Sequence, residues 1–340
     1  MSAAAITLKQ GGGGRAMRTL IEKLFVRDFA TLPFDGVGVG AMDDGAAIRI
    51  GDQWLVITTD SHVIHPIFFP GGDIGRLSIC GTVNDLAMMG ATNVLALTCS
   101  VILEEGFALE SLEAIQHSML AACRESRAPV VTGDTKVMGR GELDGIVINT
   151  CGIGLTRTLV RDNSLSAGDR IIVTGSIAEH GLAVLAARHN IDFESDLVSD
   201  VAPLNALIAT VLDAFPGAIT AMKDPTRGGV ASALHEMGGK SGVGIVLQER
   251  AIPITPAVRS VGELLGIDPL HVANEGKALL GVRADYADAV IELLRAQTNG
   301  ARATIIGNCV AERPGSIILD TGFGRRLLAE PDGEPLPRIC

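Results

Sequence analysis

The sequence has few aromatic residues, no long apolar segment and fewer basic than acidic residues. Aromatic side chains make up 3% of its 340 residues, and charges or glycines interrupt every apolar run before the ~18 residues that a membrane-spanning helix needs. Its 28 Lys and Arg against 39 Asp and Glu give a net charge of −11 without a basic cluster, which argues against nucleic acid as the main ligand. No basic start with a following apolar stretch opens the chain, so we expect a cytoplasmic protein with no membrane or secretory segment.

Cysteine is also scarce, and its spacing is not that of a metal or redox site. The six cysteines form no Cys-x-x-Cys pair, the usual spacing of zinc and thioredoxin-type sites. A chain that is 47% hydrophobic can hold itself together by its core without a disulfide framework. Cys80, Cys99 and Cys151 lie in apolar runs, where we expect small buried hydrophobes. Cys340 differs because it is the last residue.

Short β-branched runs alternate with helical patterns on both sides of a turn-rich segment at 161–169, which predicts two α/β lobes. We assign residues 1–37 to a flexible lead of fourteen residues and an N-terminal helix, 38–160 and 168–330 to the lobes, and 331–340 to an extended proline-rich tail. The pattern leaves open whether the sheets are parallel or mixed. We predict strands at 46–50, 54–59, 93–102, 129–137, 146–155, 170–174, 218–222, 244–247, 278–282 and 304–310, and helices at 15–29, 74–89, 109–125, 177–189, 203–215, 227–238, 257–265 and 286–295.

Three familiar motifs come close but lack their structural context. Gly-Gly-Lys-Ser at 238–241 follows a predicted helix and has Leu234 where a P-loop needs glycine. The alternating glycines of 36–40 follow a helix, whereas a dinucleotide fingerprint follows a strand. His62 and His65 precede a proline and do not share a helix face. We therefore reject a P-loop and a Rossmann site, and we disfavour zinc.

Acidic residues recur at turns and at the ends of apolar runs. Asp43 and Asp44 lie in a turn, Asp60 closes the run LVITTD, Asp85 lies in a helix that glycines flank, and Asp134 ends PVVTGD. Carboxylates that converge at a sheet edge would hold Mg²⁺, which prefers oxygen ligands and bridges phosphates. The alternative is that these aspartates only form turns, which they favour intrinsically.

Three further segments carry charged side chains that suit phosphate chemistry. Lys136 follows Asp134 at a strand and could neutralise a phosphoryl group, although a solvated lysine is equally expected. Arg227 lies in the segment 223–229, whose glycines open backbone N–H groups to an anion. Glu275 is a candidate base, with a surface turn as the default interpretation.

Cys340 ends a segment that prolines stiffen without folding it. Pro335 and Pro337 extend the chain, so the thiol is expected on a swinging arm. A thiolate is a nucleophile, and Arg338 would favour its formation, although the α-carboxylate opposes it. We interpret this terminal cysteine as functional.

Seven motifs in order resemble the HypE family of [NiFe]-hydrogenase maturation factors, from about residue 15 to the last residue. They are TTDSH at 58–62, FFPGGDIG at 68–75, ICGTVNDLAMMGA at 79–91, VTGDTKVM at 131–138, DPTRGG at 224–229, HVANEGK at 271–277 and the terminal PRIC at 337–340. The resemblance implies the fold of aminoimidazole ribonucleotide synthetase, in which an N-terminal lobe gives strands to a dimeric β-barrel. The C-terminal lobe would be α/β, and ATP would lie between the lobes without a Walker loop.

The same resemblance implies a reaction and its partners. A carbamoyltransferase, HypF, loads a carbamoyl group on the terminal thiol, HypE dehydrates the thiocarboxamide to a thiocyanate with ATP, and a HypC–HypD complex accepts the cyano group. The implied catalytic residues are Cys340, Glu275 and Lys136. The implied ATP-binding residues are Asp43, Asp44, Asp60, Asn84, Asp85, Gly133, Asp134, Thr135, Asp224 and Arg227, with Mg²⁺ held by Asp44, Asp60, Asp85 and Asp134.

Other functions stay open at this stage. A selenophosphate synthetase would transfer a phosphoryl group from ATP, but its reactive cysteine lies in a glycine-rich loop near the start, and no cysteine precedes Cys80 here. A thiamin-phosphate kinase has no use for a terminal cysteine. A non-catalytic maturation scaffold would recruit partners through its tail and would not hydrolyse ATP.

Overall fold

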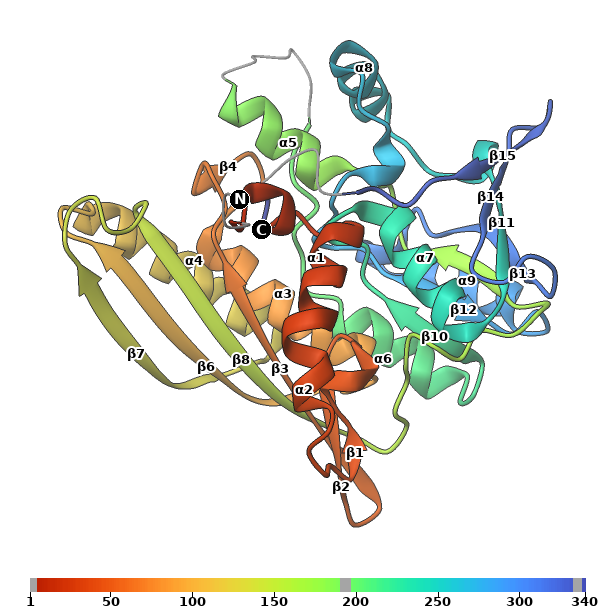
Figure 1. The fold of residues 1–340 in the computed structure, drawn as a ribbon, viewed down its shortest axis with the longest axis horizontal. Coiled ribbons are helices and arrows are strands. Elements are labelled where there is room, and N and C mark those ends of the chain that lie inside the picture. The colour runs from red at the N-terminus through yellow and green to blue at the C-terminus, as the bar shows by residue number, and fades with distance from the viewer. Residues whose placement is uncertain (1–4, 190–196, 333–337) are drawn as a thin grey trace.

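The computed structural model describes residues 5–189, 197–332 and 338–340, and Figure 1 shows two α/β lobes side by side. The helices are η1 Leu8–Gln10, α1 Gly14–Ile21, η2 Glu22–Val26, α2 Arg27–Phe29, η3 Val39–Ala41, α3 Ile74–Met88, α4 Leu109–Ser126, α5 Glu179–Arg188, α6 Asn205–Ala214, α7 Gly229–Ser241, η4 Glu249–Ala251, α8 Pro256–Leu265, η5 Pro269–His271, α9 Ala287–Arg295 and η6 Thr298–Gly300. The strands are β1 Gly36–Val37, β2 Ala46–Ile50, β3 Gln53–His62, β4 Phe68–Phe69, β5 Gly72–Asp73, β6 Asn93–Glu104, β7 Val130–Met138, β8 Ile146–Thr156, β9 Arg170–Val173, β10 Ile219–Lys223, β11 Gly244–Gln248, β12 Leu279–Val282, β13 Thr304–Val310, β14 Ile317–Asp320 and β15 Arg325–Leu328. None of the helices within the described ranges has the length and hydropathy to span a membrane.

The first lobe is a six-stranded sheet in the order β1-β2-β3-β8-β6-β7, antiparallel except where β7 runs parallel to β6. Buried and half-buried residues alternate along β8, as they do when one face of a strand lies on a core. Helix α3 begins where Asp73 caps it by accepting hydrogen bonds from the N–H groups of Gly75 and Arg76. It contacts β3, β8 and α6, so it lies between the sheet and the second lobe and is buried nearly all round.

Strand β7 forms an open edge of this sheet. All nine of its residues are exposed, and Val131 and Val137 are 60% and 67% exposed although they are apolar. An edge of this length with exposed valines is a surface on which another chain can pair.

The second lobe is a seven-stranded sheet in the order β10-β12-β9-β13-β11-β14-β15, antiparallel except between β11 and β14. Both sheets are therefore mixed, which settles the point that the sequence pattern left open. The larger core cluster runs from the first lobe into the second and includes Ile339, which is 2% exposed.

Most predicted elements are present, with small shifts at their ends. The strands at 46–50 and 304–310 have the predicted bounds, and the N-terminal helix runs from Gly14 to Phe29 with a π-helical turn in its middle. Strands β14 and β15 were not predicted, and neither were the two-residue strands β1, β4 and β5. Strand β3 continues to His62, so the prediction that Asp60 closes a strand is wrong. Asp134 likewise lies within β7 rather than at its end.

The two ends of the chain are packed more closely than expected. Gly12 and Gly13 are buried, and the first turn of α1 donates backbone hydrogen bonds from Arg15 to Pro331 and from Ala16 to Asp332. The end of the expected flexible lead is therefore packed, and the helix that follows it is held by residues at the start of the tail. Of the predicted extended tail, residues 333–337 lie outside the described ones, whereas 338–340 dock on the body. Cys80 and Cys99 are buried as predicted, while Cys151 is half-buried.

Candidate active site

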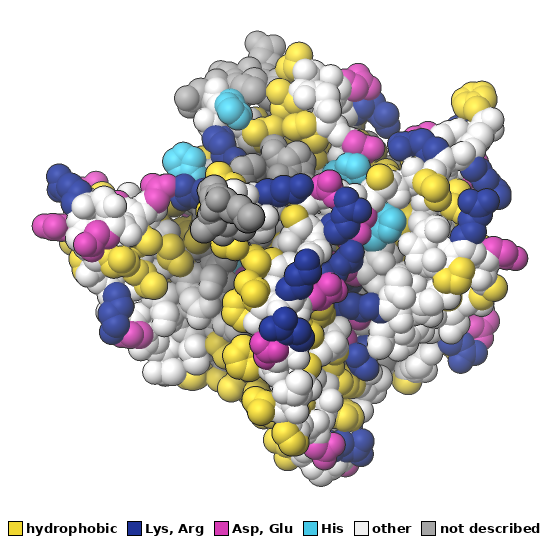
Figure 2. All heavy atoms as spheres, viewed as in Figure 1, with side chains coloured by type: hydrophobic (Ala, Val, Ile, Leu, Met, Phe, Trp, Pro, Cys, Tyr) yellow, Lys and Arg dark blue, Asp and Glu magenta, His cyan; other side chains and the backbone are white. Residues whose placement is uncertain are grey.

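A cavity of about 270 Å³ brings together both lobes, helix α1 and the last residue of the chain. Its charged and reactive lining consists of Arg18, Asp44, Asp60, Asp85, Lys223, Asp224, Arg227, Glu236, Glu275 and Cys340. Figure 2 shows basic side chains gathered along the middle of this face, over α1, although the chain is acidic overall. The close packing of Gly13 explains its glycine, because a Cβ there would meet the Cβ of Arg227 at 2.7 Å.

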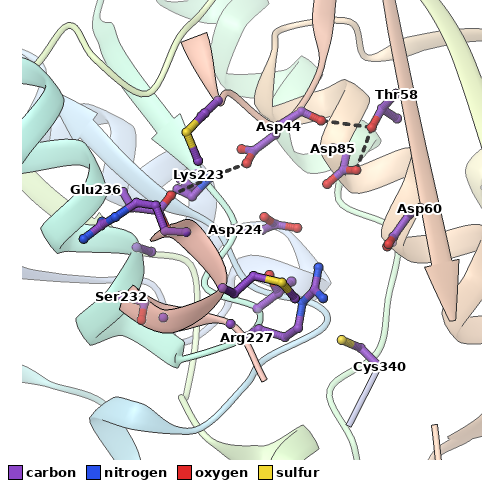
Figure 3. A pocket seen from close by; sticks show the side chains of 18 of the residues that line it. Asp44, Thr58, Asp60, Asp85, Lys223, Asp224, Arg227, Ser232, Glu236 and Cys340 are labelled. Atoms are coloured by element: carbon purple, nitrogen blue, oxygen red, sulfur yellow. Dashed lines mark hydrogen bonds and ion pairs between the residues drawn. The ribbon is translucent and has the colours of Figure 1, made fainter. Parts of the chain in front are cut away.

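Four aspartates form an acidic wall of the cavity, and each comes from a different element (Figure 3). Asp44 precedes β2, Asp60 lies in β3, Asp85 lies in the buried helix α3, and Asp224 follows β10. Burial and then the charge of Asp44 raise the pKa of Asp224 to about 7. Burial and then the charges of Asp224, Asp60 and Asp44 hold the pKa of Asp85 well above its ordinary value. The wall therefore repels further negative charge and favours a cation.

Thr58 connects Asp85 to Asp44 through hydrogen bonds. The Oγ1 of Thr58 lies 2.8 Å from Oδ2 of Asp85 and 2.9 Å from the carbonyl oxygen of Asp44. One hydroxyl can donate only one hydrogen, and the Asp44 carbonyl can only accept. The Thr58 hydroxyl is therefore shared between these two acceptor oxygens, and its hydrogen bond lowers the pKa of Asp85 in opposition to burial.

Lys223 compensates the acidic wall on one side. Its ammonium group forms an ion pair with Asp44 and lies 3.4 Å from Oε2 of Glu236. Burial opposes this charge, but the charges of Asp44 and Glu236 hold the pKa of Lys223 well above its ordinary value. Sequence reasoning did not place Lys223 or Glu236 in the site. The position of Lys223 directly before Asp224 at a strand end was a signal for the first of them.

Cys340 enters the opposite side of the cavity next to a buried arginine. The Cys340 side chain points toward Arg227 in Figure 3, and the charge of Cys340 is the main cause that raises the pKa of Arg227. Glu275 lines the same cavity, is 4% exposed, and its Oε1 has no hydrogen-bond partner. Burial, followed by the charge of Asp224, holds the pKa of Glu275 well above its ordinary value. A proton acceptor and a cation thus lie near the terminal residue.

Several predicted site residues do not line the cavity of this chain. The carboxylate of Asp43 accepts the N–H of Asp44 and pairs with Nε of Arg161, both at 3.2 Å. Asn84 is buried between the lobes, where its Nδ2 donates to the carbonyl oxygens of Ala202 and Glu275. The other four, Gly133, Asp134, Thr135 and Lys136, lie on the exposed strand β7, where Lys136 pairs with Asp134 at 2.8 Å.

The acidic wall fits a divalent cation in its chemistry. Oδ2 of Asp44 is buried without a hydrogen-bond partner. The pKa of Asp85 is raised by burial and then by the neighbouring carboxylates, whose repulsion a cation relieves. Across the described ranges, however, no three His, Cys, Asp or Glu side chains already stand as a set that could hold a metal ion. A cation here would need further ligands, such as phosphate oxygens.

The chain is similar to proteins of hydrogenase maturation. Residues 42–156 match the family model of the AIR synthase related protein N-terminal domain, and residues 166–320 match that of the C-terminal domain. The carbamoyl dehydratase HypE of Rhizobium leguminosarum bv. viciae is 45% identical over 338 residues, which cover 98% of this chain and 95% of that protein. A solved HypE–HypF complex has a chain that is 41% identical with a TM-score of 0.85, covering 92% of this chain and 99% of that one. A solved HypE in complex with ATP is 40% identical with a TM-score of 0.81, covering 99% and 100%.

Proposed function

Because the chain belongs to the HypE family of carbamoyl dehydratases, we propose that it converts a thiocarboxamide on its own Cys340 to a thiocyanate with ATP. The family that the seven motifs predicted is confirmed, and so is the aminoimidazole ribonucleotide synthetase-like fold. One observation supports assigning this reaction to residues of this chain. Cys340 enters a cavity that Arg227, Glu275 and the acidic wall also line.

The reaction needs an oxygen made into a leaving group and two protons removed from nitrogen. The amide oxygen of the S-carbamoyl group takes the γ-phosphoryl group of ATP, which leaves ADP, and one N–H proton departs as C=N forms. Loss of the second N–H proton and of phosphate then leaves S–C≡N. Arg227 would hold the charged oxygens bidentately, and Glu275 would accept a proton from nitrogen.

Glu275 has to lose its own proton before it can act as a base. Burial and the nearby carboxylates raise its pKa well above the ordinary value, while Arg227 lowers it. More positive charge in the cavity lowers that pKa further, so the base would become active as the site fills.

Mg²⁺ would be held by Asp44, Asp60 and Asp85 together with phosphate oxygens, and it would neutralise the charge of the transferred group. Asp44 forms an ion pair with Lys223 in the structure, so it can hold the metal only if Lys223 pairs with a phosphate instead. The unpartnered Oδ2 of Asp44 supports a ligand role for that side chain.

We also propose a homodimer in which β7 of one copy serves the cavity of the other. The exposed length of β7 and its outward valines support a pairing surface. Lys136 and Asp134, which do not line the cavity of their own chain, would then reach the partner's cavity together with Gly133 and Thr135. Lys136 would steady the amide oxygen, and Asp134 would be the remaining ligand of the metal.

The partners follow from the chemistry of the tail. Carbamoylation requires a transferase, and the solved HypE–HypF complex supports HypF in that role for this chain. The thiocyanate requires an acceptor for its cyano group, for which we propose a HypC–HypD complex.

Mass spectrometry of the C-terminal peptide tests this function. The chain is incubated with HypF, carbamoyl phosphate and ATP, and the expected product is a peptide that gains a carbamoyl group and then loses one water. Cys340→Ala, which removes the acceptor, is the matched control. A carbamoylated peptide that never loses water would refute the dehydratase, and an absence of ATP turnover would favour a scaffold.

A further inference from the structure

Backbone atoms hold the end of the tail on the segment after β3. The N–H of Val63 donates to a main-chain carboxylate oxygen of Cys340, and the N–H of His65 donates to the carbonyl oxygen of Arg338, both at 3.2 Å. Nη2 of Arg188 also donates to the Arg338 carbonyl at 2.7 Å. Ile339, between these two residues, is almost fully buried. Backbone and side-chain donors of the body therefore fix the last three residues of the tail.

His180 supplies a further hydrogen bond to the backbone of this tripeptide. Its Nε2 lies 2.7 Å from the carbonyl oxygen of Ile339, and its Nδ1 lies 2.8 Å from Oγ of Ser199. The ring is fully buried and packs edge-on against Phe69, with 5.4 Å between the ring centres. Burial lowers the pKa of His180, although Asp200 opposes this, so the imidazole is neutral at pH 7.

The partners of His180 determine its tautomer. A carbonyl oxygen only accepts, so Nε2 carries the hydrogen, and Nδ1 of the neutral ring must accept. Ser199 fits this, because its Oγ accepts the N–H of Val201 at 3.1 Å and its hydroxyl hydrogen is available for Nδ1. The chain of donors runs from Val201 through Ser199 and His180 to Ile339, and each polar atom in it is used.

The same short segment also positions the candidate base. Asp200, between Ser199 and Val201, accepts the N–H groups of Glu275 at 3.2 Å and Gly276 at 3.3 Å. Its carboxylate also pairs with Lys277 at 3.0 Å, and the charge of Lys277 helps to lower the pKa of Asp200. Residues 199–201 therefore hold His180 through one side chain and the backbone of Glu275 through the next.

We propose that His180 and Ser199 form a latch that recognises the Ile339 carbonyl and holds Cys340 in the cavity for dehydration. His180 is then a positioning residue, which acts through the tail and does not touch the reacting atoms. This inference rests on the proposed function, because the tail must leave the cavity to receive its carbamoyl group and return to lose water. A latch on Ile339 favours the inward state, and opening it costs the His180 hydrogen bond.

An alkylation experiment measures the latch directly. The full chain, without nucleotide, is treated with iodoacetamide, and the modification of Cys340 is followed in the peptide that begins at Asp332. His180→Phe keeps the ring and removes both nitrogens, so it should raise the alkylation rate of Cys340 roughly 2- to 12-fold, the effect of one neutral hydrogen bond. His180→Gln, which restores a donor, should return most of the protection. His117→Gln, an exposed histidine change on α4, is the matched control.

Activity then separates a latch from a merely structural histidine. With HypF and ATP, His180→Phe should slow the dehydration step by a similar factor without slowing carbamoylation. Unchanged alkylation and dehydration would overturn the latch. If the half-buried Cys123 and Cys151 also become more reactive, His180→Phe has loosened the fold. The alkylation of Cys340 in a second variant, Ser199→Ala, then tests the latch. A selective rise at Cys340 in that variant supports the latch, and no rise overturns it. Failure of the wild type to dehydrate would refute the proposed function and leave the alkylation result interpretable.

Discussion

Replacement of Glu275 by glutamine should have opposite effects on catalysis and on stability. The change keeps the size of the side chain and removes its ability to accept a proton. General-base catalysis typically contributes 10²–10⁴ in rate, so dehydration should slow by that factor, or about 3–5 kcal/mol of activation free energy. The backbone contacts of Glu275 with Asp200 and Asn84 do not involve its side chain and remain.

The stability effect follows from the raised pKa of Glu275. A carboxyl group whose pKa is raised by folding gives full stability below its unfolded pKa and loses stability as the pH rises. If Glu275 stays protonated in the fold at pH 7, the 2.5 pH units above its ordinary value of 4.5 set a ceiling of about 3 kcal/mol on this cost. Glu275→Gln avoids that cost, so its free energy of unfolding should exceed that of the wild type at pH 7, with the difference vanishing toward pH 4.

Two measurements check both effects on the same preparations. Urea unfolding between pH 4 and 8 gives the free energies, and mass spectrometry of the C-terminal peptide gives the dehydration rate. Glu263→Gln, an exposed position on α8, is the matched control and should change neither. Normal dehydration in folded Glu275→Gln would remove Glu275 as the base. A variant less stable than the wild type at pH 7 would show that the carboxyl group stabilises the fold, and the reasoning from burial would be wrong.

Three other changes test the rest of the site. Asp85→Ala should abolish ATP turnover and leave the chain folded, which circular dichroism and a phosphate-release assay check together; normal turnover would remove Asp85 from the site. Asp224→Asn should raise the free energy of unfolding at pH 8 but not at pH 4, because folding raises the pKa of Asp224 to about 7. Urea unfolding at pH 4 and at pH 8 measures this difference. An equal change in the free energy of unfolding at the two pH values would contradict it. Val137→Lys on β7 should shift light scattering from a dimer toward the 35.3 kDa chain, whereas Leu264→Lys on α8 should not, and a wild-type monomer at micromolar concentration would refute the dimer.

The sequence predicted most of the secondary structure because long periodic segments carry a strong local signal. The helix at 74–89 and the strand at 304–310 are examples, and their bounds agree with the structure to within a residue. Strands β14 and β15 were missed because each has only four residues, and β15 is an edge strand whose first three residues are exposed. Residue type alone indicated the acidic positions, since aspartates near strands and turns are visible without a fold.

Other features of the site depend on tertiary contacts that no local pattern encodes. Asp43 and Asp44 are adjacent in sequence, yet the carboxylate of Asp43 pairs with Arg161 while that of Asp44 lines the cavity. The partners of Lys223 come from segments far apart in the sequence, so its role could not be read from its neighbours. The docking of the tail was hidden for the same reason, since prolines signal an extended segment but not its receptor.

The way the tail is held suits a residue whose side chain changes during the reaction. Cys340 would carry a thiol, then a carbamoyl group, then a cyano group, so a receptor built on its sulfur could fit only one of these states. The hydrogen bonds described above instead reach main-chain oxygens of Arg338, Ile339 and Cys340, which the chemistry leaves unchanged. Recognition through the backbone therefore admits the carbamoylated tail as well as the thiol form. It also limits the strength of the hold, because a few hydrogen bonds and one buried isoleucine can be released again to a partner.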